Sequence, residues 1–266
     1  MKVGFIGCGN MGGALLSAAL KTLPAADILA ADRDNERLRA LEERYALQTG
    51  TAQQIAACAD YVFLGVKPQG LPGLFEEIAP ALAARKDRFV LISMAAGVSI
   101  QRIEDLCGCS CAVIRIMPNT PVAVGAGMIL YAANASVSSE EVADFTHILA
   151  AAGRLDALPE ALIDAACALS GSGPAFVDVF IEALSDGAVA CGLPRDKALL
   201  YAAQTVYGAA KLMLESAKHP AQLKDAVCSP GGTTIAGVQA LEEGAFRADT
   251  MAAVTAAYDR ALELGR

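Results

Sequence analysis

The sequence predicts an α/β protein in which a doubly wound, mostly parallel sheet is followed by an all-helical domain. Short apolar runs alternate with helical segments as far as Leu158, and strand signals disappear from Pro159 onward. A glycine-rich turn joins the first apolar run to the first helix. Because 266 residues are too many for one comfortable core, we expect two domains, at residues 1–158 and 159–266.

The glycine-rich turn has the spacing Gly-x-Gly-x-x-Gly, between a buried strand at residues 3–6 and a helix at 14–20. In a Rossmann fold, Gly7 permits the tight turn, Gly9 lets the backbone approach a pyrophosphate, and Gly12 lets the helix pack on the strand. A structural turn that binds nothing fits this context less well. The turn is therefore predicted to bind a dinucleotide cofactor through Ile6, Gly7, Cys8, Gly9, Asn10, Met11 and Gly12.

The second strand, at residues 28–31, ends at Asp32 and Arg33. An acidic residue about 20 positions after the glycine motif accepts from the ribose 2′-OH of NAD, whereas a nearby arginine favours the 2′-phosphate of NADP. Both side chains are therefore predicted to contact the cofactor, and together they leave its identity open. The alternative is an exposed turn that caps the following helix.

Three more strands are expected at residues 59–66, 89–93 and 111–116. Their carboxyl ends face the ligand crevice of such a sheet, so the loops after them are expected to contact the cofactor. Lys67 is either catalytic or, as we favour, part of a loop that contacts the cofactor through its backbone. Asn119 either bonds the nicotinamide amide or lies in a plain turn. The residues predicted at these strand ends are Val66, Lys67, Pro68, Ala95, Ala96 and Asn119.

The remaining elements of the first domain are expected to be helices through residues 74–82 and 100–106, a strand at 127–131, a helix that starts at 138–141 and a last strand at 154–157. Helices alone are expected afterwards, over residues 160–169, from Pro174 to Gly192 and from Pro194 onward. Their apolar stripes are wide for so small a domain, so we expect them to be buried against a second copy of the chain, in an obligate homo-oligomer.

Composition excludes some classes of protein. The net charge is −8 and basic residues are scattered, so nucleic acid is not an expected partner. Lys21 and Pro24 interrupt the first apolar stretch, and Arg115, Pro118 and Pro121 interrupt the most apolar middle one. The amino terminus opens directly into the glycine turn. We therefore expect no membrane span and no signal peptide, and a cytoplasmic protein.

Neither the cysteines nor the histidines indicate a further site. The eight cysteines lie in apolar segments, as small core residues do. Cys107, Cys109 and Cys111 alternate, but no histidine or further cysteine pair lies at zinc-ligand spacing, so no metal is expected. His147 lies in an amphipathic helix and His219 in a loop, and both are interpreted as structural.

A second glycine-rich turn, at residues 228–235, also leads into a helix. Its free N–H groups suit a carboxylate, and its hydroxyl groups exceed what a simple cap needs. On spacing alone, a substrate site and an ordinary capped helix are equally good interpretations.

Six segments occur in order along nearly the whole chain: Phe5–Gly12, Val66–Pro68, Ala95–Gly97, Met117–Pro121, Ser170–Pro174 and Cys228–Ile235. Together they resemble the signature segments of the pyrroline-5-carboxylate reductase family. The resemblance implies reduction of 1-pyrroline-5-carboxylate to L-proline, the last step of proline synthesis, with NADPH, or NADH as the alternative. It also implies dimerisation through the helical domain, and some members of the family form decamers.

Carried over by position, Thr234 matches the threonine whose hydroxyl bonds the substrate ring nitrogen and is the expected catalytic residue. The residues that match the carboxylate-binding loop are Ser229, Gly231, Gly232 and Thr233. Asp32 departs from the uncharged residue often found in NADPH-preferring members. Two alternatives stay open: a reductase for another small acid, such as a β-hydroxyacid dehydrogenase, and a regulatory protein that binds a dinucleotide without turnover.

Overall fold

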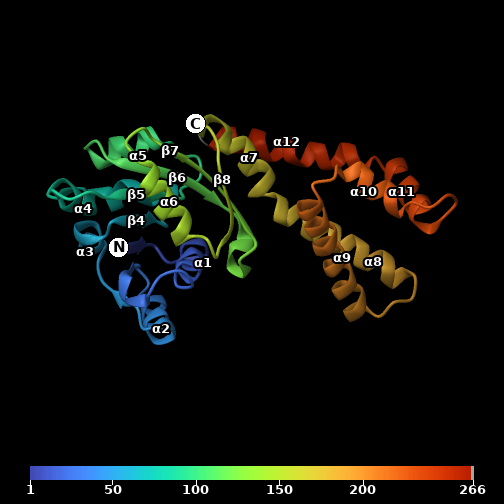
Figure 1. The fold of residues 1–266 in the computed structure, drawn as a ribbon, viewed down its shortest axis with the longest axis horizontal. Helices are drawn as coiled ribbons and strands as arrows, with labels where there is room; N and C mark the ends of the chain where they lie inside the picture. Colours follow the sequence, from blue (N-terminus) through green and yellow to red (C-terminus); the bar gives the residue numbers. More distant parts are fainter. Residues whose placement is uncertain (265–266) are drawn as a thin grey trace. The chain divides into compact units, whose positions relative to one another are not determined.

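The computed structural model describes residues 1–264 and consists of two compact units (Figure 1). The first unit is Met1–Ser172 together with the segment from Tyr258 onward, and the second is Gly173–Ala257. The first holds the sheet, and the second is helical. The expected domain limit at residue 158 precedes this division by one helix, and it stays a prediction.

The first unit contains one eight-stranded sheet in the order β3-β2-β1-β4-β5-β6-β7-β8. Every neighbouring pair is parallel except β6 and β7, which are antiparallel. The predicted doubly wound, mostly parallel sheet is therefore confirmed. Its strands are β1 Val3–Ile6, β2 Ile28–Ala31, β3 Gln48–Thr49, β4 Tyr61–Leu64, β5 Val90–Ser93, β6 Ala112–Pro118, β7 Gly127–Ala133 and β8 Gly153–Ala157.

Helices cover both faces of the sheet because its central strands are apolar on both sides. In β1, Val3 and Phe5 belong to one core and Ile6 to the other, as the alternation of side chains along a strand requires. Helices α1 and α6 contribute to the first core, and α3, α4 and α5 to the second. The helices of this unit are α1 Asn10–Ala19, α2 Asn35–Tyr45, α3 Ala52–Cys58, α4 Leu71–Ala83, α5 Ile100–Cys107, α6 Ser139–Ile148 and α7 Ile163–Ser170.

The strand order places a crevice at the centre of the sheet. From β1 the chain builds outward to β2 and β3 on one side, and β4 and the later strands lie on the other. The loops that follow β1 and β4 therefore leave in opposite directions, and a crevice opens between the carboxyl ends of these two strands. A ligand site is expected there.

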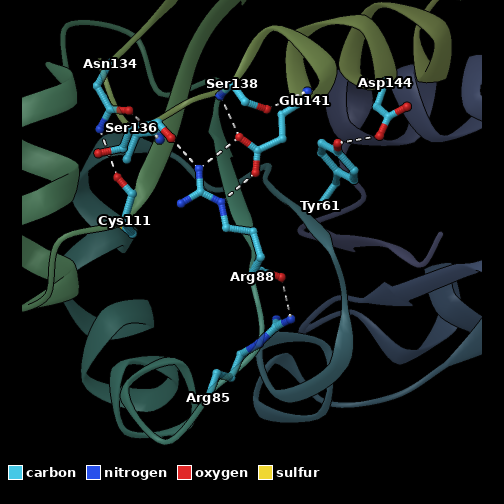
Figure 2. A network of polar contacts seen from close by, with 10 residues as sticks. Tyr61, Arg85, Arg88, Cys111, Asn134, Ser136, Ser138, Glu141 and Asp144 are labelled. Atoms are coloured by element: carbon cyan, nitrogen blue, oxygen red, sulfur yellow. Dashed lines mark hydrogen bonds and ion pairs between the residues drawn. The ribbon is translucent and has the colours of Figure 1, made fainter.

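A polar network fastens α6 to the amino ends of β4 and β5, at the opposite edge of the sheet (Figure 2). Arg88 donates from Nε and Nη2 to the carboxylate of Glu141 at 2.7 and 2.9 Å. Glu141 also accepts from the N–H of Ser138, which caps α6. The Tyr61 hydroxyl donates to Asp144 at 2.8 Å. The hydrogen bond from Arg88 lowers the pKa of Glu141, although burial opposes it.

The helical unit buries very little within itself. Among its described residues only Ser185, Ala198 and Ala202 are buried, and many large apolar side chains are exposed. Val179 on α8 and Leu214 on α9 are two of them, at 67% and 66% exposure. The helices are α8 Gly173–Ala190, α9 Arg195–Ser216, α10 Pro220–Val227, α11 Thr233–Glu243 and α12 Phe246–Leu264, whose last residues return to the first unit. The sequence predicts helices throughout this part, but it gives no separate bounds for α10 and α12.

One stretch of the described residues, Glu160–Ala190, is long and apolar enough to cross a membrane by length and composition alone. It consists of a 3-10 turn, α7 and α8, and it contains Pro174 and several acidic residues. Only 6% of its most apolar window is buried. The same exposed face suits contact with another apolar protein surface.

Candidate coenzyme and substrate sites

The loop between β1 and α1 uses its three glycines for two different purposes. Gly7 has φ +91°, and a Cβ on Gly12 would lie 2.1 Å from the Gly7 carbonyl oxygen, so the backbone itself requires both glycines. Gly9 differs, because its φ of −63° suits any residue and a Cβ there would meet nothing within 4 Å. The missing side chain of Gly9 therefore leaves open space beside the start of α1.

The start of α1 has free hydrogen-bond donors. No side chain caps the helix at Gly9, and its first turn contains no acidic residue. The N–H of Gly13 is the first to bond within the helix, to the Gly9 carbonyl at 2.7 Å. The N–H groups of Asn10 and Met11 are thus available to an anion at the positive end of the helix dipole. This geometry fits a pyrophosphate group.

A cavity of about 550 Å³ opens beside this loop, at the carboxyl ends of β1, β2 and β4. The predicted cofactor contacts that line it are Ile6, Gly7, Gly9, Asp32, Arg33, Val66 and Lys67. The lining residues that were not predicted are Ala31, Asn35, Arg37, Leu38, Gly50, Thr51, Ala52, Gln53, Gly65, Gly70, Leu74 and Glu77. Gly65 could have been inferred, since it directly follows an apolar strand, and a Cβ there would lie 2.2 Å from the Gly7 carbonyl oxygen.

Asp32 is held by three donors of the protein. The Cys8 N–H donates to its Oδ2 at 2.6 Å, the Asp34 N–H to its Oδ1 at 2.9 Å, and Arg37 Nη1 to its Oδ2 at 3.1 Å. Burial raises the pKa of Asp32, but these hydrogen bonds outweigh it, and the pKa lies below its ordinary value. Arg37 also pairs with Asp34 at 3.3 Å, whereas Arg33 is exposed at the cavity rim.

The remaining predicted cofactor contacts lie outside the cavity lining: Cys8, Asn10, Met11, Gly12, Pro68, Ala95, Ala96 and Asn119. Ala95 is buried and Ala96 is exposed. Asn119 has partners in the protein, since its Nδ2 donates to the Ser170 carbonyl at 2.9 Å and its Oδ1 accepts from the Met128 N–H at 2.8 Å. Its amide fastens the end of α7 to the β6–β7 connection, and one N–H and one lone pair stay unused.

The second glycine-rich turn forms the start of α11 in the helical unit. Gly231 has φ +67°, and the N–H of Gly232 bonds the Ser229 carbonyl at 3.0 Å. Gly232 is the N-cap residue, and no side chain caps the helix. Thr233 and Thr234 are exposed in its first turn. Because none of the nearby hydroxyls serves as a cap, the turn offers free N–H groups and free hydroxyls to a carboxylate.

Neither histidine lies in these two regions. His147 is exposed in the last turn of α6, and His219 caps α10, where its Nδ1 accepts from the Ala221 N–H at 3.2 Å. The sulfur atoms of Cys107 and Cys109 lie 3.4 Å apart beside α5. Over residues 1–264, no cluster of three or more His, Cys, Asp or Glu side chains has a metal-binding arrangement.

Two family models match the chain. Residues 160–264 match the model described as pyrroline-5-carboxylate reductase dimerisation. Residues 2–97 match the model described as NADP oxidoreductase, coenzyme F420-dependent. The first match covers the helical unit with α7, and the second covers the glycine-rich loop and the cavity.

Curated relatives and solved structures extend the likeness to the whole chain. It is 44% identical to a pyrroline-5-carboxylate reductase of Synechocystis, covering 100% of this chain and 99% of the relative, and 40% identical to that of Escherichia coli, covering 100% and 98%. The structure of a pyrroline-5-carboxylate reductase from Coxiella burnetii superposes with a TM-score of 0.93 at 35% identity, covering 100% of this chain and 98% of that one. A pyrroline carboxylate reductase of Plasmodium falciparum with NADP bound gives 0.86 at 30% identity with the same coverage. The predicted resemblance is confirmed: the chain belongs to the pyrroline-5-carboxylate reductase family.

Proposed function

We propose that this protein reduces 1-pyrroline-5-carboxylate to L-proline with NADPH, or with NADH as the alternative, as the last step of proline biosynthesis. The observation that carries the proposal is the presence of two uncapped helix starts in one chain, α1 beside a large cavity and α11 beside a cluster of hydroxyls. Each suits one of the two anionic reactants, a pyrophosphate and a carboxylate. Full-length identity of about 40% to reductases of this name supports it.

The first unit supplies the coenzyme site. The space beside Gly9 admits the pyrophosphate, and the first N–H groups of α1 bind it. The loops after β4, β5 and β6 are proposed to contact the rest of the coenzyme through Val66, Lys67, Pro68, Ala95, Ala96 and Asn119. When bound, the dihydronicotinamide supplies the hydride that the imine carbon accepts.

The start of α11 supplies the substrate site. Its free N–H groups and the turn of Ser229, Gly231, Gly232 and Thr233 bind the carboxylate. Thr234 is the second residue of the helix, and its exposed hydroxyl bonds the ring nitrogen of the imine. The carbon that carries the carboxylate is bonded to the ring nitrogen, so the turn and Thr234 hold two neighbouring points of the ring and orient the adjacent imine carbon for hydride transfer.

The ring nitrogen must gain a proton as the carbon gains a hydride. A threonine hydroxyl is a weak acid, so we propose that the substrate arrives as the protonated iminium, whose N–H donates to the Thr234 hydroxyl. Hydride transfer to the imine carbon then leaves a neutral amine, and Thr234 relays to it a proton taken from water. Neither histidine is assigned to this proton transfer, because His147 is exposed in α6 and His219 caps α10. No step of this scheme needs a metal ion.

The deciding experiment is a steady-state assay with 1-pyrroline-5-carboxylate, run separately with NADPH and NADH. The expected result is coenzyme oxidation that depends on the imine and yields proline in equal amount. A protein that bound coenzyme but oxidised none at any imine concentration would instead be a regulatory dinucleotide-binding protein.

Replacement of Thr234 by alanine tests the proposed catalytic residue. We expect kcat to fall by about 10- to 100-fold, because a hydrogen bond to the reacting nitrogen is lost. The dissociation constant for NADPH, measured by fluorescence titration, stays nearly unchanged. Thr234→Ser keeps the hydroxyl and should retain most activity, and full activity in Thr234→Ala would contradict the role.

We infer further that the protein is a homodimer joined through the helical unit, and that it acts in the cytoplasm. The dimerisation model that matches residues 160–264 indicates oligomerisation through this region. The exposed apolar side chains of α8 and α9 support the same surface. Sedimentation velocity distinguishes a dimer from a larger assembly such as a decamer. Flotation of the purified protein with lipid vesicles tests whether the apolar stretch Glu160–Ala190 binds a membrane instead.

A further inference from the structure

Asp32 occupies the position where an acidic residue contacts the coenzyme ribose in NAD-binding Rossmann folds. Its side chain is only 9% exposed, and its three hydrogen bonds all come from the protein. The shortest of them, at 2.6 Å, comes from the N–H of Cys8, which lies between the first two glycines of the pyrophosphate loop. The carboxylate thus joins the end of β2 to the loop after β1.

A second hydrogen bond reinforces this connection. The N–H of Gly7 donates to the Ala31 carbonyl at 2.8 Å, so two successive N–H groups of the loop bond to the last residue of β2 and the residue after it. Gly7 has φ +91°, a conformation that glycine adopts readily and L side chains rarely do. A hydrogen bond to a charged acceptor is about twice as strong as a neutral one. Asp32 therefore contributes directly to the shape of the loop.

The hydrogen bonds also limit what Asp32 can offer to a ribose. An ionised carboxylate has about four lone-pair sites, and the protein uses three of them, two on Oδ2 and one on Oδ1. Only one site is left, whereas the 2′- and 3′-hydroxyls of NADH would need two. To accept both hydroxyls, Asp32 would have to give up Asp34, Arg37 or Cys8.

We propose that Asp32 is a positioning residue that holds the pyrophosphate loop through the Cys8 amide and therefore supports NADPH and NADH binding alike. Discrimination between the two coenzymes then falls to Arg33. Arg37 already bridges Asp32 and Asp34, whereas Arg33 is exposed at the cavity rim and has no ion-pair partner within residues 1–264. Its guanidinium suits the 2′-phosphate that only NADPH carries. The inference rests on the proposed function and names the residues that select its coenzyme.

The first test measures the loop without coenzyme. Amide hydrogen exchange of the peptide spanning residues 5–12 is compared between the wild-type chain, Asp32→Ala and Asp32→Asn. We expect faster exchange in Asp32→Ala and an intermediate rate in Asp32→Asn, whose amide oxygen can still accept from Cys8. Equal exchange in wild type and Asp32→Ala would overturn the proposal, and this measurement does not depend on any turnover.

The second test measures the dissociation constants of NADPH and NADH by fluorescence titration. We expect Asp32→Ala to weaken both coenzymes by a similar factor, about tenfold, because one charge-assisted hydrogen bond that shapes the loop is lost. Arg33→Ala should weaken NADPH alone. If Asp32→Ala weakened NADH but left NADPH unchanged or tighter, Asp32 would be a ribose acceptor and the proposal would be wrong. Tight coenzyme binding without imine reduction would refute the proposed function instead and leave this inference standing.

Discussion

At the scale of single residues, the glycines of the pyrophosphate loop separate structural from binding requirements. Gly7 and Gly12 are needed by the backbone, whereas Gly9 is surrounded by open space. The sequence predicts all three from their spacing, but it cannot tell which of them the fold itself needs. That distinction comes from the φ angles and from the atoms that a Cβ would meet.

Gly9→Val is therefore expected to fold normally and to lose coenzyme binding. A valine at φ −63° is not strained, and its side chain would fill the space proposed for the pyrophosphate. Gly12→Val is the contrasting variant, because its Cβ would meet the Gly7 carbonyl oxygen at 2.1 Å and the fold should be destabilised. Thermal unfolding and NADPH titration on both variants check this, and normal NADPH affinity in Gly9→Val would contradict it.

Glu141 gives a pH-dependent prediction. Its hydrogen bond from Arg88 holds its pKa below the ordinary value of 4.5, so its stabilisation is complete above pH 4.5 and is lost as the pH falls through the lowered pKa. Because Arg88 is largely exposed, the effect should be about 1 kcal/mol or less. We expect the difference in urea midpoint between wild type and Glu141→Gln to be constant from pH 7 to about 5 and to shrink at lower pH. Glu140→Gln, at an exposed neighbouring position, is the matched control.

The orientation of Asp32 shows where sequence reasoning ends at this scale. Asp32, 20 residues after Gly12, lines the cavity as expected of a residue near the coenzyme, and its contact with a coenzyme stays a prediction. Its bond to the Cys8 amide depends on a side-chain rotamer and on the path of a loop 24 residues away. No spacing rule contains that information.

At the scale of elements, the predicted strands are all present, the polar β8 among them, and of the described strands only the two-residue β3 was missed. All four central strands have long apolar runs that are buried on both faces, which is a strong local signal. β3 consists of only Gln48 and Thr49 at the sheet edge, and it has no such run. The antiparallel direction of β7 depends on which neighbour it pairs with, and a residue pattern does not specify that.

Helix α7 is fastened near its start to β6 and at its end to the β6–β7 connection, and this arrangement was not anticipated. At one end, buried Arg115 on β6 donates to Asp164 at 2.6 Å and pairs with Glu160 at 3.4 Å. At the other, Asn119 donates to the Ser170 carbonyl. The partners are 45 to 51 residues apart in sequence, so spacing gives no indication of them.

Arg115→Met should consequently weaken the attachment of α7. Two carboxylates would lose their cation, but each is about one-third exposed and can be partly hydrated. We expect a loss of about 2 kcal/mol in the free energy of unfolding, less than for a fully buried pair. Urea denaturation measures this loss. Arg115→Lys keeps the positive charge and should therefore lose less of the free energy of unfolding than Arg115→Met. An unchanged urea midpoint in Arg115→Met would show that the ion pairs contribute nothing to stability.

At the scale of the whole molecule, the apolar surface of the helical unit requires a partner. Leu214→Glu on α9 should shift the protein toward monomer, because a charge would then have to be buried in the proposed dimer contact. Val124→Glu is a matched control, since Val124 is an exposed apolar residue of the first unit at 78% exposure. Sedimentation velocity compares the two variants. If Leu214→Glu formed dimers of normal stability, the proposed contact through α9 would be wrong and the dimer would have to form through another surface.

Because helices α8 to α11 contain so few buried side chains, the stability of the protein should depend on its concentration. A unit that buries so little alone gains its stability from association, so its melting temperature should rise with protein concentration. Newly made chains would be vulnerable to proteolysis until they met another copy. The abundance of the enzyme in a cell should then depend more than proportionally on its rate of synthesis.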